Sequence, residues 1–238
     1  MQADKTQDVS TDSKPYSLAA TLTNLNSEII TYYKDRAKEY EKIYSKPERQ
    51  NDLLVAEKIL QDTFADKDIL EIACGTGYWT QKISITSKSI LAIDINDAVI
   101  EIARSKTYSP GEVSFQTADI FNLTFAAKHK YLFGGFIWSH IKLEDLNNFI
   151  CKVHSIVEDH GTIVFMDNNY VAGSNLPVTQ IDNLGNTYQT RTLENGTAHK
   201  VLKNFPTETF IRQLLTDRAT EITFMNLQYY WILKYKTI

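Results

Sequence analysis

Apolar positions recur with a helical period in the first quarter of the chain. Residues 25–44 place apolar and tyrosine side chains three or four positions apart, and residues 47–64 repeat the pattern. Pro47 stands where a helix can begin, because proline fits the first helical turn. The pattern predicts two helices before any strand. The polar residues ahead of them, 1–20, are expected to form a flexible leader without a targeting signal.

The period then changes. Short apolar runs alternate with amphipathic stretches such as 97–106 and 143–157, and either Asn96 or Asp97 suits the first position of a helix. Alternating strands and helices favour a parallel sheet with helices on both faces. The runs that predict the five strands are 69–73, 90–93, 113–116, 131–138 and 162–166.

The last third of the chain has a different pattern. Two β-rich runs, 187–193 and 197–202, flank Asn195-Gly196, a strong hairpin signal. A helix is expected over 206–215, followed by strands at 221–225 and 228–235 whose short link requires them to be antiparallel. The fold class is therefore α/β: a Rossmann-like, seven-stranded, mostly parallel sheet with an antiparallel C-terminal strand. It carries N-terminal helices and a β-hairpin insertion after strand five.

Composition and charge limit the number of domains and the kinds of partner that we expect. The chain has 238 residues, 43% of them hydrophobic, which suits one globular domain. A net charge of -4 gives no basic excess for a phosphate backbone, so we expect no nucleic-acid partner. Two cysteines suggest a reducing compartment, and no apolar run reaches the roughly 18 residues of a membrane span. We expect a cytoplasmic monomer or homodimer, with no membrane partner and no metal site.

A glycine-rich turn carries the first chemical signal. The run at 69–73 leads directly into Cys74-Gly75-Thr76-Gly77, and a helix is expected to follow. Glycines let the backbone approach a ligand closely, and free N–H groups at the helix start suit a carboxylate or phosphate. The longer dinucleotide fingerprint GxGxxG is absent because Thr80 replaces its last glycine.

Acidic residues follow at the ends of successive strands. Glu71 lies four residues before Gly75, Asp94 lies nineteen residues after it, and Asp119 follows the third strand. These positions suit an ammonium group, a ribose and an adenine amino group respectively, with Ile120 beside the base. Singly, each acid has another explanation: a lysine partner for Glu71, and helix capping for the two aspartates. Because the three acids follow one another on successive strands, together they favour binding of one ligand that carries all three groups over the separate explanations.

With these motifs the chain resembles the class I S-adenosylmethionine-dependent methyltransferases, in particular a small-molecule, UbiE-like branch with a YYxxRAxxY helix, here Tyr32 to Tyr40. The resemblance implies S-adenosylmethionine as cofactor and S-adenosylhomocysteine as product. Ala73 replaces a glycine of the usual loop, which we expect to be tolerated if its φ stays negative. The aromatic helix face could equally pack on the core. The implied cofactor-binding residues are Tyr33, Tyr40, Glu71, Ala73, Cys74, Gly75, Thr76, Gly77, Asp94, Ile95, Asp119, Ile120 and Phe136.

On the acceptor side, the resemblance places the end of strand four beside the transferred methyl group. His140 follows that strand and is the candidate catalytic base, although it could instead pack under or cap the next helix. The signature [DNS]PP[YFW] is missing there, which argues against methylation of adenine N6 or glutamine. The polar insertion at 170–205 is expected to cover the acceptor, or else to be a solvated hairpin. Its candidate substrate-binding residues are Tyr170, Tyr188, Arg191 and His199, the last also a second candidate base; Arg191, with Lys200 and Lys203, would suit an acidic acceptor.

The sequence thus predicts a methyltransferase domain over 21–238, capped by helices at 21–65. Its expected reaction is methyl transfer to an oxygen or nitrogen of a small-molecule acceptor. The alternative is a protein of the same fold that binds the cofactor without transferring methyl. RNA methylation is a third, disfavoured by the acidic balance.

Overall fold

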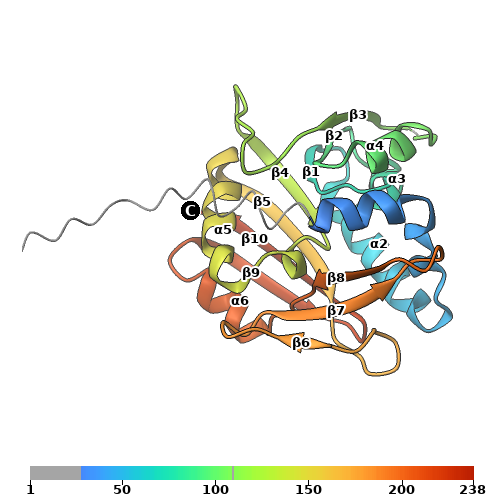
Figure 1. Cartoon of the computed structure of the whole chain (residues 1–238). Helices are drawn as coiled ribbons and strands as arrows, with labels where there is room; N and C mark the ends of the chain where they lie inside the picture. The colour runs from blue at the N-terminus through green and yellow to red at the C-terminus, as the bar shows by residue number, and fades with distance from the viewer. Residues whose placement is uncertain (1–27, 109) are drawn as a thin grey trace, which may run out of the picture.

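The computed structural model describes residues 28–108 and 110–238, so the predicted leader and the start of the first predicted helix lie outside the described residues. Helical residues 28–36 continue as the 3₁₀-helix η1 (Ala37–Ser45), a short η2 (Pro47–Arg49) and α2 (Gln50–Phe64). Pro47 is the first residue of its helix, as predicted. The N-terminal helices lie along one side of the molecule (Figure 1).

The main sheet has seven strands in the order β3-β2-β1-β4-β5-β10-β9. β1 to β5 are parallel, and β10 runs antiparallel to both of its neighbours. This arrangement confirms the predicted fold class. The strands are β1 (Asp68–Ile72), β2 (Ser89–Asp94), β3 (Glu112–Thr117), β4 (His129–Gly135), β5 (Val157–Asn168), β9 (Ala219–Asn226) and β10 (Tyr230–Thr237).

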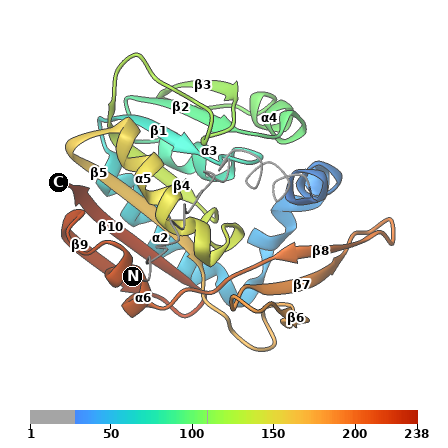
Figure 2. The same ribbon diagram turned by 60° about the vertical axis from the view of Figure 1, so that its left-hand side comes forward.

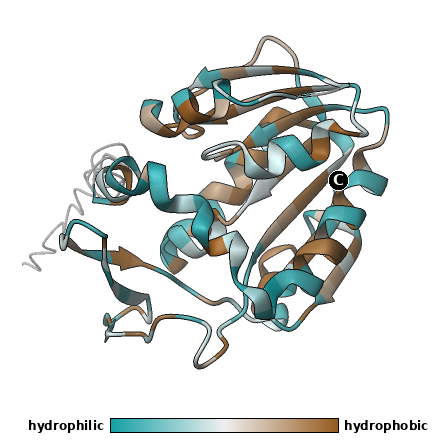
Figure 3. Cartoon of the chain, turned by 90° about the vertical axis from the view of Figure 1, so that its right-hand side faces the viewer, coloured by the Kyte–Doolittle hydropathy of each residue, from teal (hydrophilic) through white to brown (hydrophobic). Residues whose placement is uncertain are grey.

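Helices cover both faces of this sheet. Side chains of α2, α3 (Tyr78–Ser84) and α4 (Asp97–Arg104) form one hydrophobic cluster with the strands, and those of α5 (Leu146–Ile156) and α6 (Glu208–Leu214) form the other. The two layers are visible on either side of the strands in Figure 2. In Figure 3 the helices carry bands of hydrophobic and hydrophilic colour, as expected of helices with one buried face.

The glycine loop follows the central strand of the sheet, β1. β1 is buried over all but its first residue, because helices cover both of its faces. Its neighbours β2 and β4 run in the same direction, so the carboxyl ends of all three strands meet at one edge. The glycine loop follows β1 at that edge, where ligands bind in open α/β sheets.

A second, three-stranded sheet follows β5. It comprises β6 (Gln180–Ile181), β7 (Thr187–Thr192) and β8 (Ala198–Leu202), paired antiparallel in that order. The β7–β8 hairpin matches the predicted one, whereas β6 is too short to give a sequence pattern. Figures 1 and 2 show this sheet beside the N-terminal helices and apart from the main sheet. The short helices η3 (Trp138–His140) and η4 (Leu143–Asp145) connect β4 to α5.

Among the described helices, none has both the length and the apolar character needed to cross a membrane. Both cysteines are free, with Cys74 buried and Cys151 exposed.

Candidate active site

A cavity lies at the carboxyl edge of the main sheet, between the ends of β1, β2 and β4 and the N-terminal helix. Its lining is mainly apolar, with a few polar groups that converge on it. The predicted residues that line it are Tyr33, Tyr40, Ala73, Gly75, Asp94, Ile95, Asp119, Ile120, Phe136 and His140. The fold therefore brings together residues that are up to 107 positions apart in the sequence.

The glycine loop forms one wall of the cavity. The Gly75 N–H donates to Asp94 Oδ2 at 2.9 Å, and the Cys74 N–H donates to the Ile93 carbonyl at 3.0 Å, so the loop is fastened to the end of β2. Gly77 has a φ of 77°, and a side chain there would collide with Tyr108. Only glycine therefore fits at this turn.

The expectation for Ala73 is wrong, because its φ is +53° rather than negative. The close turn from β1 into the loop requires the left-handed conformation, which costs an alanine roughly 1–2 kcal/mol. Phe136, which follows β4, also has a positive φ of 60°. Both residues line the cavity. Backbone strain of this kind clusters at ligand-binding sites.

Glu71 lies just behind this wall. Its side chain is 2% exposed, and its Oε2 atom has no hydrogen-bond partner within the described structure. Burial raises the pKa of Glu71 to about 8, with a smaller contribution from the Asp94 charge. Together with Cys74 and Thr76 it lines a small hollow that shares Tyr40, Ala73, Gly75 and Phe136 with the main cavity. A buried acid with an unused oxygen is suited to a cationic ligand group.

Asp94 and Asp119 present carboxylates to the cavity while also holding their own loops. Asp94 accepts from the backbone N–H groups of Gly75 and Asn96, each at 2.9 Å. Burial raises its pKa, and those hydrogen bonds oppose the rise. Asp119 accepts from the Phe121 N–H and from the Asn122 amide. The predicted alternative, helix capping, is wrong for both residues: Asn96 caps α4, and Asp119 holds a turn. Each carboxylate oxygen still keeps a second lone pair for a ligand.

The N-terminal helix closes the cavity with tyrosines. Tyr33 and Tyr40 pack edge to face with their ring centroids 5.6 Å apart, and Tyr40 does the same with Tyr44 at 6.0 Å. η1 is also fastened to the glycine loop, because Thr76 Oγ1 donates to Glu41 at 2.6 Å. The aromatic face thus serves both packing and the cavity lining.

His140 lies at the far end of the cavity, in η3. Its Nδ1 atom is 2.7 Å from the Leu202 carbonyl oxygen, and its Nε2 atom is 2.6 Å from the Tyr33 hydroxyl. Burial lowers its pKa well below 6.5, and the positive charges of Lys203 and Arg191 lower it further. The imidazole is therefore neutral at physiological pH.

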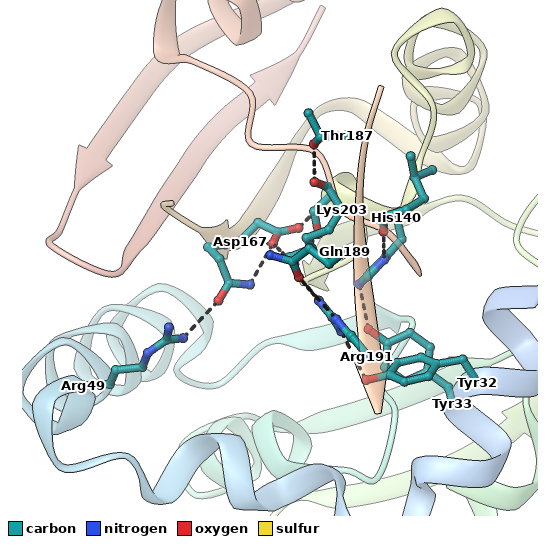
Figure 4. Close-up of polar contacts among 12 residues, drawn as sticks. Tyr32, Tyr33, Arg49, His140, Asp167, Thr187, Gln189, Arg191 and Lys203 are labelled. Atoms are coloured by element: carbon teal, nitrogen blue, oxygen red, sulfur yellow. Dashed lines mark hydrogen bonds and ion pairs between the residues drawn. The ribbon is translucent and has the colours of Figure 1, made fainter. Parts of the chain in front are cut away.

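A buried polar network extends beyond His140 (Figure 4). Lys203 Nζ donates to Ser139 Oγ at 2.5 Å and to Asp167 Oδ1 at 3.0 Å, and the two charged side chains are 4% and 0% exposed. Burial opposes ionisation of Asp167, but the Lys203 charge and the backbone N–H groups of Ser139 and Asn168 outweigh it and lower the Asp167 pKa. Burial lowers the pKa of Lys203 to about 8, so this ion pair persists at neutral pH.

Arg191 lies on the other side of Tyr33. Its Nε and Nη2 atoms donate to Gln189 Oε1 at 3.3 and 2.9 Å, and Nη1 donates to the Tyr32 hydroxyl at 3.3 Å. The Gln189 amide in turn donates a hydrogen bond to the Leu176 carbonyl. No carboxylate forms an ion pair with Arg191 anywhere in residues 28–108 and 110–238. The guanidinium is thus fixed in place without a counter-ion from the described chain.

The other candidates from the insertion lie away from the cavity. Tyr170 is 45% exposed and packs against Phe205, while the Tyr188 ring lies under the Lys200 ammonium. His199 Nε2 lies 3.6 Å from Asp35 Oδ2, and the imidazole packs edge to face on Tyr32. Their substrate-binding roles remain predictions that this arrangement does not favour.

The sequence did not predict the roles of some residues in and around the site. Asp167 is the last residue but one of β5 and gives no signal of its own in the sequence, and nothing marks Tyr32 or Gln189 as partners of Arg191. Asn96 was expected only as a possible cap, and it is the cap: it accepts from the Ala98 N–H. Its side chain also donates to the Ile30 carbonyl, fastening the N-terminal helix to the cavity. These roles depend on contacts between distant segments, which no local pattern records.

Part of the chain is similar to a known family of protein domains. Residues 69–161 match the family described as methyltransferase domain. Malonyl-[acyl-carrier protein] O-methyltransferase 1 of Ilyobacter polytropus (strain ATCC 51220 / DSM 2926 / LMG 16218 / CuHBu1) is 28% identical over 102 residues. That match covers 41% of this chain and 37% of the relative's length.

Solved structures share the fold over most of the chain. A DhpI–SAH complex superposes with a TM-score of 0.75 at 22% identity, covering 90% of this chain and 98% of that one. The N-methyltransferase NodS of Bradyrhizobium japonicum WM9 gives a TM-score of 0.55 at 15% identity, covering 81% and 98%. Residues 69–161 thus match a methyltransferase domain, and the chain shares its overall fold with these solved structures.

Proposed function

We propose that this protein binds S-adenosylmethionine in the carboxyl-edge cavity and transfers its methyl group to an oxygen or nitrogen of a small-molecule acceptor. The observation that carries the proposal is the set of acids Glu71, Asp94 and Asp119, which lie on or directly after three neighbouring strands around one cavity. The bound cofactor would supply an electrophilic methyl group. The protein's part is to bind both reactants, align them and exclude water.

Each acid suits a different part of the cofactor. The unpartnered Glu71 oxygen suits its ammonium group, directly or through a water. Asp94 has lone pairs left for ribose hydroxyls, and Asp119 with Ile120 suits the adenine. Two solved structures that share this fold are complexes of DhpI with SAH and with SAM and HEP, which supports the assignment. The methionine end then lies toward Tyr33, Tyr40 and the loop 73–77.

The acceptor side favours an acceptor that carries an acidic group. Arg191 is positioned by Gln189 and Tyr32 but has no carboxylate partner in the described chain. Arg191 is half-buried, and its guanidinium could pair with an acidic ligand group through charge-assisted hydrogen bonds. The relatives include an O-methyltransferase and an N-methyltransferase, so the attacked atom stays open between oxygen and nitrogen.

Calorimetric titration with S-adenosylhomocysteine tests the cofactor assignment. We expect Asp94→Ala to weaken binding on the order of 100-fold, because hydrogen bonds to a charged group contribute about 1.5–3 kcal/mol each. The matched control is Asp97→Ala, which removes an exposed carboxylate three residues along. Unchanged binding by Asp94→Ala would refute the ribose assignment.

A second experiment tests transfer itself. The protein is incubated with methyl-labelled S-adenosylmethionine and the small-molecule fraction of a cell extract. A labelled small molecule supports the proposal. Tight binding with no labelled product would favour the alternative, a cofactor-binding protein that transfers no methyl.

A further inference from the structure

The hydrogen bonds of His140 determine which of its nitrogens carries a proton. The Leu202 carbonyl oxygen can only accept, so Nδ1, at 2.7 Å, must be the donor. In a neutral imidazole the other nitrogen, Nε2, then holds a lone pair. The Tyr33 hydroxyl lies 2.6 Å from Nε2 and must donate to it. The basic nitrogen of His140 is therefore already occupied.

This arrangement has a consequence for the acceptor. A base whose lone pair is occupied by a neighbouring hydroxyl does not meet the acceptor directly. The hydroxyl oxygen does, because it keeps its own lone pairs after donating its proton. Tyr33 and His140 both line the cavity, with ring centroids 5.4 Å apart and an interplanar angle of 85°. Tyr33 thus offers a proton-accepting oxygen backed by His140.

We propose that Tyr33 is a catalytic residue of the methyl transfer and relays the acceptor's proton to His140, with the Leu202 carbonyl fixing the direction of the relay. The inference rests on the proposed function. As the acceptor oxygen or nitrogen bonds to the methyl carbon, the carbon–sulfur bond breaks and its electron pair stays on sulfur. The acceptor's proton passes to Tyr33 Oη while the Tyr33 proton passes to His140 Nε2, leaving an imidazolium that later releases its proton to water.

The charges around the pair suit a relay that acts late in the reaction. Tyr32, Tyr40 and Arg36 face it from the N-terminal helix, Asp167 from β5, Arg191 from β7 and Lys203 after β8. Burial, Lys203 and Arg191 lower the His140 pKa, and burial raises the Tyr33 pKa, so both groups rest in their neutral forms. A weak base suffices here, because an acceptor atom becomes strongly acidic as it gains a methyl group.

Nitrogen NMR of the whole, cofactor-free protein tests the hydrogen-bond geometry without activity. Long-range ¹H–¹⁵N spectra, with His140 assigned by His140→Gln, should show a neutral ring protonated at Nδ1. Tyr33→Phe should keep that tautomer but move the Nε2 signal to that of a nitrogen with no hydrogen bond. Tyr32→Phe, the matched control on the neighbouring residue, should leave the Nε2 signal unchanged. A ring protonated at Nε2, or a signal unaffected by Tyr33→Phe, would overturn the proposal.

Kinetics test the relay itself. With the labelled cofactor and extract fraction above, Tyr33→Phe and His140→Gln should each slow transfer by about 10²- to 10⁴-fold, the usual contribution of general base catalysis. The double variant should be no slower than the slower single variant, because the two residues act as a unit. Phenylalanine keeps the ring that lines the cavity and loses only the hydroxyl. Binding of S-adenosylhomocysteine to Tyr33→Phe should therefore weaken far less than the rate of transfer falls.

Two outcomes separate the proposals. If the single-variant losses multiply in the double variant, or if Tyr33→Phe transfers methyl at the normal rate, the relay is wrong while the proposed function stands. If the wild-type protein fails to bind S-adenosylhomocysteine, the proposed function is wrong, and the NMR result still reports on the pair.

Discussion

Two sides of the cavity are built in different ways. The loop side, comprising Glu71, the loop 73–77, Asp94 and Asp119, is assembled from consecutive strand ends, and its key contact joins residues 19 positions apart. The hairpin side comprises Tyr33 and His140, which line the cavity, and the residues Asp167, Arg191 and Lys203 outside its lining. It joins segments 107 and 159 positions apart through Tyr33–His140 and Tyr32–Arg191. The loop side is fixed by strand order, whereas the hairpin side depends on the packing of separate elements.

This difference predicts where substitutions harm folding and where they harm only binding. The hairpin side holds charges at near-zero exposure that are tolerable only when paired. The loop side holds acids whose partners are mostly backbone N–H groups or a ligand. Loss of a charged partner on the hairpin side should therefore lower stability, whereas loss of an acid on the loop side should mainly weaken ligand binding.

The largest expected effect is at the buried ion pair. Asp167→Ala leaves the Lys203 ammonium buried without its carboxylate, which should lower the free energy of unfolding by about 3–5 kcal/mol. Urea unfolding measures this change. Adding Lys203→Met to Asp167→Ala should recover part of the loss, because the uncompensated charge is removed. Asp159→Ala, at an exposed and long 3.9 Å pair with Lys128, is the control and should have no measurable effect.

An Asp167→Ala loss as small as that of Asp159→Ala would contradict the description of the hairpin side as an interdependent charged network. It would mean that solvent reaches Lys203 easily and that the two sides differ less than their contacts indicate.

The same contrast explains how much the sequence could predict. The alternation of strands and helices, the antiparallel end of the sheet, the hairpin and the loop-side acids all follow from local periodicity and spacing. β6 and the Asp167–Lys203 pair do not, because two residues carry no periodic signal and an ion pair across 36 positions leaves none. His140 was predicted as a base from its position alone, but its occupied nitrogen depends on Tyr33 and Leu202, which only the fold brings to it.

The second prediction concerns Glu71 and pH. Its pKa of about 8 lies above the ordinary value of 4.5, so its protonated form is favoured in the folded, ligand-free protein. The stability this group contributes is present below about pH 4.5 and is lost as pH rises through 8. A cationic ligand group would favour the ionised form instead. Affinity for S-adenosylhomocysteine should therefore rise on the order of tenfold from pH 6.5 to 8, following the ionised fraction.

Calorimetric titration across this pH range measures the rise, and Glu71→Gln should abolish it. Asp94→Asn is the matched comparison on the loop side, since it should weaken binding at every pH while keeping the rise. A pH-dependent affinity that survives Glu71→Gln would assign the titration to another group and remove Glu71 from the ammonium site.

The smallest expected effect tests the loop itself. Ala73 adopts a φ of +53°, a conformation that costs an alanine roughly 1–2 kcal/mol and costs glycine almost nothing. Ala73→Gly should therefore raise the free energy of unfolding by up to about 1 kcal/mol, since the more flexible unfolded chain offsets part of the gain. The control is Ala92→Gly, a buried position in β2 outside the left-handed region, which should lose about 0.5–1 kcal/mol. Opposite signs in urea unfolding would show that the loop is strained where it meets its ligand. Equal losses would mean that the alanine carries no strain, and the rigidity of the loop side would then rest on the hydrogen bonds of the loop to Asp94, Ile93 and Glu41.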